Sequence, residues 1–525
     1  MTVVGATACD INGDGFVDVL LTQRARAGDA LQHRLFLGDG VVLRAAPDWT
    51  VPASVGELHL LDWHGRTLVD MLGMRADGGG LTVWEAVAAG GGGGGDGKGT
   101  STATATGHRL VPAPEEMCAL ATGPMQSSAF ADVNGDGLAD LLLVCGDGDA
   151  AGHLELWLAQ EEGGFGGRVR WALPRGHGPV RVADVNGDGA VDVLFVVCDP
   201  PGSCAREHAL HVLYNVQVPF CTHGGSGAEG CRRVKDGLLS VDASGSKATG
   251  SKATGSKATG SKATGSRATG SRATGSRATG SGTGASDSVT GASGTDTGSG
   301  SGSDTQSSTS TVGFEMDGPL HVRVDLDTVL AGKGVRGMTE HPRTGEGAWL
   351  AVGDFDVDGY ADVLLPVWDE ARGAGSVVLL RNVACGDAAQ HAAGARTFQL
   401  QTEGTGALEG VGEDVRGAGW AHVRPAGGPD VLLNTAGGVR ALLNGFLQDA
   451  LFFRTEVLGG AARPYGAAVP GPAVKLAFTD AEGALRVRGS AQCAQLGYGA
   501  ALTLPFAFTG LGRTSSFVEL LSVRT

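Results

Sequence analysis

The sequence lacks the features that would assign it to a membrane-spanning or nucleic-acid-binding class. None of its 525 residues lies in an apolar stretch of the roughly 18 to 20 residues that a membrane span needs. The N-terminal segment MTVVGATACD has neither the basic start nor the apolar core of a signal peptide. Lys and Arg are scattered and the formal net charge is −16, whereas phosphate binding needs a clustered basic surface. We therefore expect no nucleic-acid partner, and we expect neither an export signal nor a membrane anchor within this sequence as written.

Motifs of hydrolases and zinc proteins are also missing. The 13 His residues form no H-E-x-x-H or similar cluster, and none of the 9 Cys residues forms a CxxC pair. The glycine-preceded serines from Ser246 onward lie in low-complexity sequence with no strand before them, so they are not nucleophile elbows. We expect no enzyme activity and no catalytic residue, and we place His33, His64 and His422 on the surface or in loops.

The cysteine spacing leaves two alternatives open. Cys198 with Cys204 and Cys221 with Cys231 are close enough for loop-closing disulfides in an oxidising compartment, and reduced core thiols are the alternative. The odd number of cysteines leaves one unpaired. No N-x-S/T sequon is present, so one common sign of secretion is absent.

Against these absences stands a nine-residue loop that occurs four times, at 10–18, 132–140, 184–192 and 354–362. Oxygen-bearing side chains occupy loop positions one, three, five and nine, position six is Gly, and position seven can turn its backbone carbonyl inward. Calcium accepts six to eight oxygen ligands in a forgiving geometry, whereas magnesium demands a tight octahedron and keeps its waters. We therefore expect one structural Ca²⁺ in each loop.

The expected calcium ligands are the residues at these five positions of each loop. They are Asp10, Asn12, Asp14, Phe16, Asp18, Asp132, Asn134, Asp136, Leu138, Asp140, Asp184, Asn186, Asp188, Ala190, Asp192, Asp354, Asp356, Asp358, Tyr360 and Asp362.

An EF-hand and a solvated acidic turn are the alternatives for this loop. An EF-hand needs a Glu at loop position twelve and helices on both sides, but that position holds Leu21, Leu143, Phe195 and Leu365. Each loop continues into a short apolar stretch that is typical of a buried strand. Four copies with every ligand position filled disfavour a mere acidic turn.

Two further copies of the loop have lost ligands. The segment 62–70 keeps Asp at both ends, but His64 and Arg66 replace the inner ligands. A more eroded copy lies around 413–417 and is followed by Asp430. We expect both copies to be metal-free, because an Arg can place its own positive charge where the cation would lie.

The repeats predict an all-β protein built around a seven-bladed propeller. Units of about 50 to 60 residues, each with an acidic loop between strands, are typical of four-stranded propeller blades. We expect strands from both ends of the propeller region to complete the last blade, since closure removes exposed sheet edges.

We divide the chain into four parts. Residues 1–241 and 313–450 form the two portions of the propeller, and 451–525 form a separate β-sandwich. Residues 242–312 are a Ser/Thr/Gly-rich insertion that offers no apolar surface, so we expect disorder there. The insertion is a neutral expansion or, alternatively, a phosphorylated or O-glycosylated spacer. Residues 314–330 are expected to complete the blade that it interrupts.

These motifs resemble a known family. FADVNGDGLADL at 130–141 resembles the FG-GAP repeat of integrin α-chain propellers. PYG at 464–466, PGP at 470–472 and TGLGRTSSF at 509–517 are similar to segments of the T-cell immunomodulatory protein family, also called the integrin-α FG-GAP repeat-containing proteins. The resemblance covers nearly all of the chain outside the insertions.

The resemblance implies a type I membrane glycoprotein with an extracellular or lumenal propeller and a C2-like β-sandwich. We therefore expect a non-catalytic, calcium-stabilised ectodomain that binds a protein or glycan through a propeller face, with membrane association through a segment missing from this chain. The alternative is a secreted hydrolase or lectin-like protein that carries FG-GAP repeats. The T-cell role in the family name is not carried over to this sequence.

Overall fold

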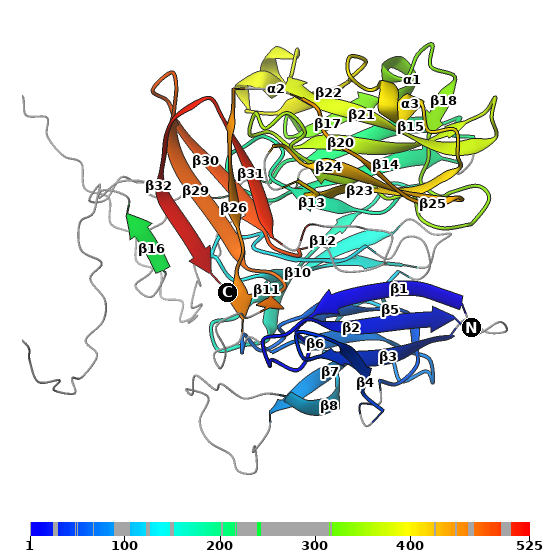
Figure 1. The fold of residues 1–525 in the computed structure, drawn as a ribbon, viewed down its shortest axis with the longest axis vertical. Helices are drawn as coiled ribbons and strands as arrows, with labels where there is room; N and C mark the ends of the chain where they lie inside the picture. The colour runs from blue at the N-terminus through cyan, green and yellow to red at the C-terminus, as the bar shows by residue number, and fades with distance from the viewer. Residues whose placement is uncertain are drawn as a thin grey trace, which may run out of the picture. The chain divides into compact units, whose positions relative to one another are not determined.

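The computed structural model consists almost entirely of β-strands, which confirms the all-β class (Figure 1). It describes residues 2–242 and 314–524 with internal gaps, of which the longest are 25–29, 89–104, 122–126, 147–151, 218–238, 460–466 and 495–503. The expected disorder of the Ser/Thr/Gly-rich insertion and the expected Cys221–Cys231 disulfide thus lie outside the described residues. No described helix combines the length and apolar character that a membrane crossing requires.

Six repeated units, here called blades 1 to 6, follow one another along the chain, and each contains one copy of the nine-residue loop. Blades 1 and 2 are joined into one eight-stranded sheet, because the strand Ala30–Gly38 of blade 1 also pairs with the strand Ser54–Leu61 of blade 2, whereas blades 3 to 6 are separate antiparallel sheets. Blade 1 contains β1 (Thr2–Cys9), β2 (Asp18–Arg24), β3 (Ala30–Gly38) and β4 (Leu43–Ala45). Blade 2 contains β5 (Ser54–Leu61), β6 (Asp70–Arg75), β7 (Leu81–Ala88) and β8 (Ala105–Pro112). Blade 3 contains β9 (Ala129–Ala131), β10 (Asp140–Cys145), β11 (His153–Ala159) and β12 (Phe165–Ala172). Blade 4 contains β13 (Arg181–Ala183), β14 (Asp192–Asp199), β15 (Glu207–Leu213) and β17 (His321–Asp325). Blade 5 contains β18 (Val335–Gly337), β19 (Ala351–Gly353), β20 (Asp362–Asp369), β21 (Ala374–Ala384) and β22 (Arg396–Leu400), and blade 6 contains β23 (Val415–Ala421), β24 (Asp430–Thr435) and β25 (Gly438–Leu442).

Short helices lie only in the connections of the second half of the chain that the structure describes. They are α1 (Leu326–Val329), α2 (Ala388–Ala392) and α3 (Gly406–Glu409). Asp325 and Asp387 cap α1 and α2 by accepting backbone N–H bonds at their N-termini.

Blade 4 is completed across the long insertion. Strand β17 pairs with β15 in the register Ala209↔Asp325 to Leu213↔His321. This pairing confirms the prediction that residues 314–330 complete the interrupted blade. Blade 4 is therefore a single sheet whose third and fourth strands come from opposite sides of the insertion.

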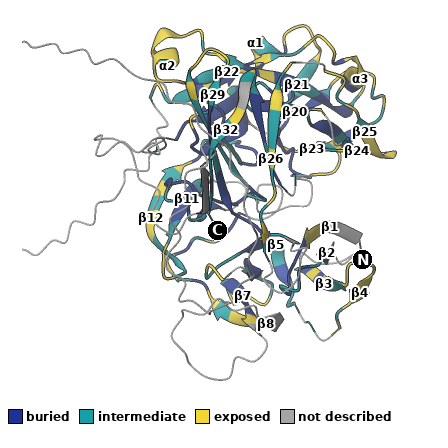
Figure 2. Ribbon diagram, turned by 60° about the vertical axis from the view of Figure 1, so that its left-hand side comes forward, coloured by how far each residue is buried: buried dark blue, intermediate teal, exposed yellow. Residues whose placement is uncertain are grey.

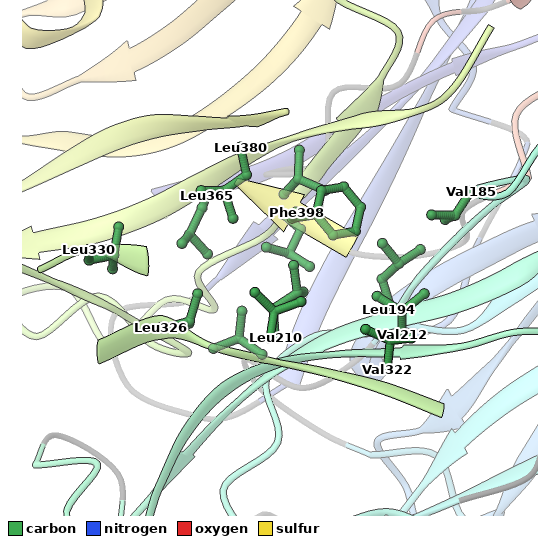
Figure 3. Packing of buried hydrophobic residues seen from close by; sticks show 14 of the residues in the cluster. Val185, Leu194, Leu210, Val212, Val322, Leu326, Leu330, Leu365, Leu380 and Phe398 are labelled. Atoms are coloured by element: carbon green, nitrogen blue, oxygen red, sulfur yellow. The ribbon is translucent and has the colours of Figure 1, made fainter. Parts of the chain in front are cut away.

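Consecutive blades share hydrophobic cores. The cluster between blades 4 and 5 joins Leu210 and Val322 to Leu365, Leu380 and Phe398, all almost completely buried (Figure 3). Equivalent clusters join blades 1 and 2 through Leu35 and Trp84, blades 2 and 3 through Leu72 and Leu141, blades 3 and 4 through Leu142 and Phe195, and blades 5 and 6 through Leu379 and Trp420. Full burial of one such side chain contributes about 1.5 to 3 kcal/mol, so these shared faces hold each blade to the next.

Inner and outer strands differ in burial as this packing requires. Strands β10, β14 and β20 are buried along nearly their whole length. By contrast, β25 is largely exposed, and β12 consists of exposed and partly exposed residues (Figure 2). A strand that is buried on both faces has a continuous run of apolar residues in its sequence. Strands β10 (DLLLVC) and β14 (beginning DVLFVV) show such runs.

The C-terminal residues form a separate arrangement of β-sheets. Its strands are β26 (Leu451–Thr455), β27 (Leu458–Gly459), β28 (Ala467–Ala468), β29 (Ala473–Asp480), β30 (Leu485–Ala491), β31 (Ala507–Gly512) and β32 (Thr514–Arg524). They pair as β32-β29-β30, β26-β31 and β27-β28, and β16 (Leu239–Asp242) is added beside β32. We call residues 451–524 the C-terminal domain.

Two details of the sequence prediction need comment. The count of seven blades is not confirmed, because the described residues supply six loop-containing units and β1 pairs only with β2. The expected exposure of His33 is wrong, because this residue lies buried in β3 between the hydroxyls of Thr22 (3.1 Å from Nδ1) and Ser54 (2.7 Å from Nε2). A polar residue on a strand is usually expected to face solvent, but the side chain of His33 is buried and hydrogen-bonded to both hydroxyls.

Candidate metal centre

The aspartate at loop position nine forms the same hydrogen bonds in all six loops. One carboxylate oxygen accepts the backbone N–H of loop position two, and the other accepts an N–H at the end of the blade's next strand. For Asp18 these donors are Ile11 (2.9 Å) and Gly38 (2.8 Å). The equivalent acceptors are Asp70, Asp140, Asp192, Asp362 and Asp430. We call this arrangement the position-nine clamp.

The clamp corrects the position of the sixth loop. Because Asp430 is the clamp residue of blade 6, its loop spans 422–430 and begins at His422. Asp414, which the sequence analysis placed in this loop, instead precedes β23 and pairs with His341 Nε2 at 3.1 Å. This copy has no acidic or amide side chain at loop positions one, three and five. Only its last residues, PDVLL, still match the other copies, so they alone could have shown where the loop begins and ends.

The aspartate at position one arranges the turn in three of the intact loops. Asp10 accepts the N–H groups of Asp14 (3.0 Å) and Gly15 (2.8 Å). Asp184 and Asp354 accept the equivalent bonds from positions five and six of their own loops. At position six, Gly15, Gly137, Gly189 and Gly359 all have φ between 86° and 90°, a conformation that favours glycine.

The inner ligand positions are also joined to one another. The carboxylate at position five accepts the N–H of position seven at 2.7 to 2.9 Å in all four intact loops. In the first three loops the Asn at position three donates from Nδ2 to the same carboxylate, for example Asn12 to Asp14 at 3.1 Å. These bonds hold the side chains of positions three and five against each other.

The carboxylates of the intact loops are concentrated and largely buried, and some of their oxygens accept no hydrogen bond. In loop 354–362, oxygens of Asp354, Asp356 and Asp362 all lie within 4.8 Å of one another. Neither carboxylate oxygen of the buried Asp356 has a hydrogen-bond partner, and the same holds for Asp132 in loop 132–140. Burying charged oxygens without partners is costly, so these loops fit a bound cation.

Burial shifts the proton affinity of these groups. It raises the pKa of Asp362 to about 8, of Asp184 to about 7 and of Asp18 to about 6. The pKa values of Asp140 and Asp354 also rise well above the ordinary range, chiefly through burial and then through neighbouring carboxylates. A divalent cation between the oxygens would favour the ionised form.

Basic side chains neutralise the two eroded loops. In loop 62–70, Arg66 Nη2 lies 3.8 Å from Asp70 and 3.3 Å from Glu85. In loop 422–430, Arg424 Nη2 donates to Asp430 Oδ1 at 3.1 Å. Arg66 stands at loop position five and Arg424 at position three, where the intact copies have expected ligands, so each eroded loop carries its own positive charge.

Basic side chains also reach two intact loops. Arg381 of β21 forms an ion pair with Asp356, and its side chain is 44% exposed. Lys475 of the C-terminal domain lies 3.6 Å from Asp132 Oδ2 and is only 12% exposed. Sequence analysis missed both residues, because neither lies within a loop and no sequence spacing connects them to one.

The cysteines divide between disulfides and thiols. Cys198–Cys204 forms the predicted disulfide, and Cys118–Cys145 forms one that sequence spacing did not indicate. Cys9, Cys385 and Cys493 are thiols. Close spacing along the chain predicts only local bridges, whereas residues 118 and 145 meet beside β10.

Comparisons with known proteins match two parts of the chain. Residues 132–195 match the FG-GAP-like repeat model, and residues 464–525 match the model described as ITFG1, C2 domain. The first match contains loops 132–140 and 184–192, and the second begins before β28 of the C-terminal domain.

Several relatives carry the same name. The T-cell immunomodulatory protein of Macaca fascicularis is 30% identical over 188 residues, which cover 33% of this chain and 59% of the relative. The human protein is also 30% identical over 188 residues, or 30% of its own length. A homolog from Plasmodium yoelii yoelii is 22% identical over 429 residues, which cover 75% of this chain and 50% of the relative.

The chain therefore spans between about a third and three fifths of the length of these curated relatives. The long match to the Plasmodium protein covers 75% of this chain, which is more than the residues that the two family models match. These findings confirm the resemblance stated from the motifs: the chain is similar to the T-cell immunomodulatory proteins, and it contains segments that match an FG-GAP-like repeat and the ITFG1 C2 domain.

Proposed function

We propose that this chain is a non-catalytic, calcium-stabilised interaction module of a membrane-associated protein, with a protein or glycan as its partner. Support comes from the FG-GAP-like repeat, from relatives named T-cell immunomodulatory protein, and from the four intact loops. Membrane association would come from a segment outside this chain, as part of an extracellular or lumenal ectodomain. We assign no catalytic residue.

The single observation that carries the calcium proposal is the set of buried carboxylate oxygens at Asp132 and Asp356 that accept no hydrogen bond. The side chains at positions one, three, five and nine of each intact loop would hold the ion, with the carbonyl of position seven. The bound ion would neutralise the clustered acids and fix the turn between two strands of a blade.

Calcium removal tests this role. Binding to the folded state alone stabilises by about 2.7 kcal/mol at a free concentration of 100 times Kd, for each site. We expect chelation to lower the melting temperature by several degrees and readdition of calcium, but not of magnesium, to restore it. A melting temperature that chelator leaves unchanged would contradict the proposal.

The partner surface is proposed at the ends of the blades opposite the nine-residue loops, intact or eroded. Those loops join the first and second strands of a blade, so the turns between the second and third strands lie at the other end of each sheet. These turns follow Arg75, Asp199, Asp369 and Thr435. Propellers vary such loops without changing the blade, so the sequence of the blade does not identify the partner.

Binding assays separate this proposal from catalysis. We expect saturable binding of the purified chain to a cell-surface protein or glycan. We expect Arg372→Glu in the turn after Asp369 to weaken that binding more than Arg34→Glu, which changes an exposed residue in the middle of β3. A hydrolase screen should detect no turnover. Turnover that disappears on replacement of one residue would overturn the non-catalytic assignment.

A further inference from the structure

The C-terminal domain contacts three of the four intact loops. Gly489 N donates to Asp184 Oδ2 at 2.7 Å, and Gly512 N donates to the carbonyl of Val357 at 3.0 Å. Lys475 forms the ion pair with Asp132. The domain therefore touches loop residues that the proposed calcium sites also use.

Loop glycines make this close approach possible. A Cβ on Gly137 would lie 2.6 Å from Cδ of Arg524, and one on Gly187 would lie 2.6 Å from Nη1 of Arg488. Gly489 itself lies against Gly189, since a Cβ there would meet the Gly189 carbonyl oxygen at 2.4 Å. These glycines serve the contact with the C-terminal domain as well as the turn.

The contacting residues lie on one face of the β32-β29-β30 sheet. Lys475 pairs directly with Gly489 of β30, so both face the same side. Ala473, two residues before Lys475, pairs with Arg524 of β32 and shares that side. Arg524 Nη1 donates to the carbonyl of Asp136, so this face spans loops 132–140 and 184–192.

Lys475 is held firmly at the second loop. Its ammonium lies 3.0 Å from Gln217 Oε1, and Gln217 Nε2 in turn donates to the carbonyl of Val133 at 2.6 Å. Asp132 differs from its equivalents in the other intact loops, because neither of its oxygens accepts a hydrogen bond within ordinary geometry. By contrast, the half-exposed Arg381 at loop 354–362 can turn to solvent.

We propose that Lys475 is a tethered competitor for the calcium ion of loop 132–140. This inference rests on the proposed calcium sites. An ammonium and a divalent cation against the same buried carboxylate repel each other strongly in a low-dielectric setting. Calcium at this loop must therefore displace Lys475 from Asp132, which removes one contact that holds the C-terminal domain to blade 3. Loop 132–140 thus binds calcium more weakly than loop 10–18, and its occupancy is linked to the docking of the C-terminal domain.

A calorimetric calcium titration of the whole chain tests this competition. The binding step of loop 132–140 is identified as the one that Asp136→Ala removes. We expect Lys475→Met, which keeps the apolar stem, to tighten that step by at least about tenfold. Lys475→Arg should leave it nearly unchanged, and so should Lys333→Met, which removes an exposed lysine paired with Glu409 far from the loops in sequence.

Hydrogen exchange of the unaltered chain gives an independent readout. We expect calcium to slow exchange in loop 10–18 and to speed it in the β29–β30 hairpin at 473–491. Slower exchange in both segments, or an unchanged affinity of loop 132–140 in Lys475→Met, would overturn the competition and leave the calcium sites standing. Absence of calcium binding at every loop would instead overturn the proposed function.

Discussion

At the scale of single residues, the aspartate at loop position nine can serve as a metal ligand and as a hydrogen-bond acceptor for the backbone, and the sequence alone does not separate these two roles. The position-nine aspartate was interpreted as a calcium ligand, and it also clamps the loop to the neighbouring strand in all six blades. The clamp explains why the eroded loops keep this aspartate after losing the inner ligands. A pattern of residue types shows that a position is constrained, but only the hydrogen bonds show which constraint acts.

Substitution of Asp430 isolates the clamp from metal binding. Asp430 accepts N–H bonds from Val423 (3.1 Å), Arg424 (3.2 Å) and Asn444 (2.8 Å) and is fully buried. Asp430→Ala leaves these donors and the Arg424 guanidinium without an acceptor, so urea unfolding should show a loss of about 2 to 4 kcal/mol. Asp430→Asn, which keeps one acceptor oxygen, should lose less. A loss below about 0.5 kcal/mol, or a change in the calcium stoichiometry, would contradict this account.

Buried histidines predict a dependence of stability on pH. Burial lowers the pKa of His33 to about 4 from an ordinary value of 6.5. Its stabilising contribution is complete above pH 6.5 and is lost as the pH falls toward 4, because the unfolded chain binds the proton first. Between pH 7.5 and 4.5 this group should cost about 2.5 kcal/mol.

The matched comparison uses His33→Gln and His391→Gln. We expect the difference in unfolding free energy between pH 7.5 and 4.5 to shrink by about 2 kcal/mol in His33→Gln. His391 is exposed on α2, so its replacement should leave the difference unaltered. Equal pH dependence in the two variants would show that His33 is not the titrating group.

At the scale of strands and blades, the sequence allowed most of the fold to be predicted. Apolar runs after each acidic loop marked the central strands, and the strand of blade 4 beyond the insertion was identified correctly. The register of the loop in blade 6 was wrong because its ligands had eroded. Asn215, Asn382 and Asn444 each donate from Nδ2 to a backbone carbonyl in the loop of the preceding blade. These three bonds join neighbouring blades, and the sequence analysis did not predict them.

Deletion of the low-complexity sequence tests the independence of blade 4 from the insertion. Strands β15 and β17 pair through backbone bonds and the buried side chains of Val212 and Val322. Removal of residues 246–300 shortens only the connection between them, and loop closure changes by about 0.6 kcal/mol per doubling of length. We expect the melting temperature to change by less than about 3 °C. A much lower melting temperature, or loss of expression, would show that the segment contributes to the fold.

At the scale of the whole molecule, the sequence predicted the propeller-type repeats and the C-terminal β-domain but not how they meet. Contacts such as Lys475 with Asp132 join residues more than 300 positions apart and depend on the sheet face that β29 presents. No periodicity within either segment carries that information. The loops are consequently both the proposed metal sites and the surface on which the C-terminal domain lies.

The central claim is that the four intact loops bind calcium and the two eroded loops do not. Equilibrium dialysis at about 1 mM free calcium, followed by metal analysis, tests it directly on the unaltered chain, Asp136→Ala and Asp62→Ala. We predict one ion for each intact loop in the unaltered chain, the loss of one ion in Asp136→Ala, and no loss in Asp62→Ala, where Arg66 supplies the positive charge. Absence of bound calcium in the unaltered chain, or loss of an ion in Asp62→Ala, would contradict the claim.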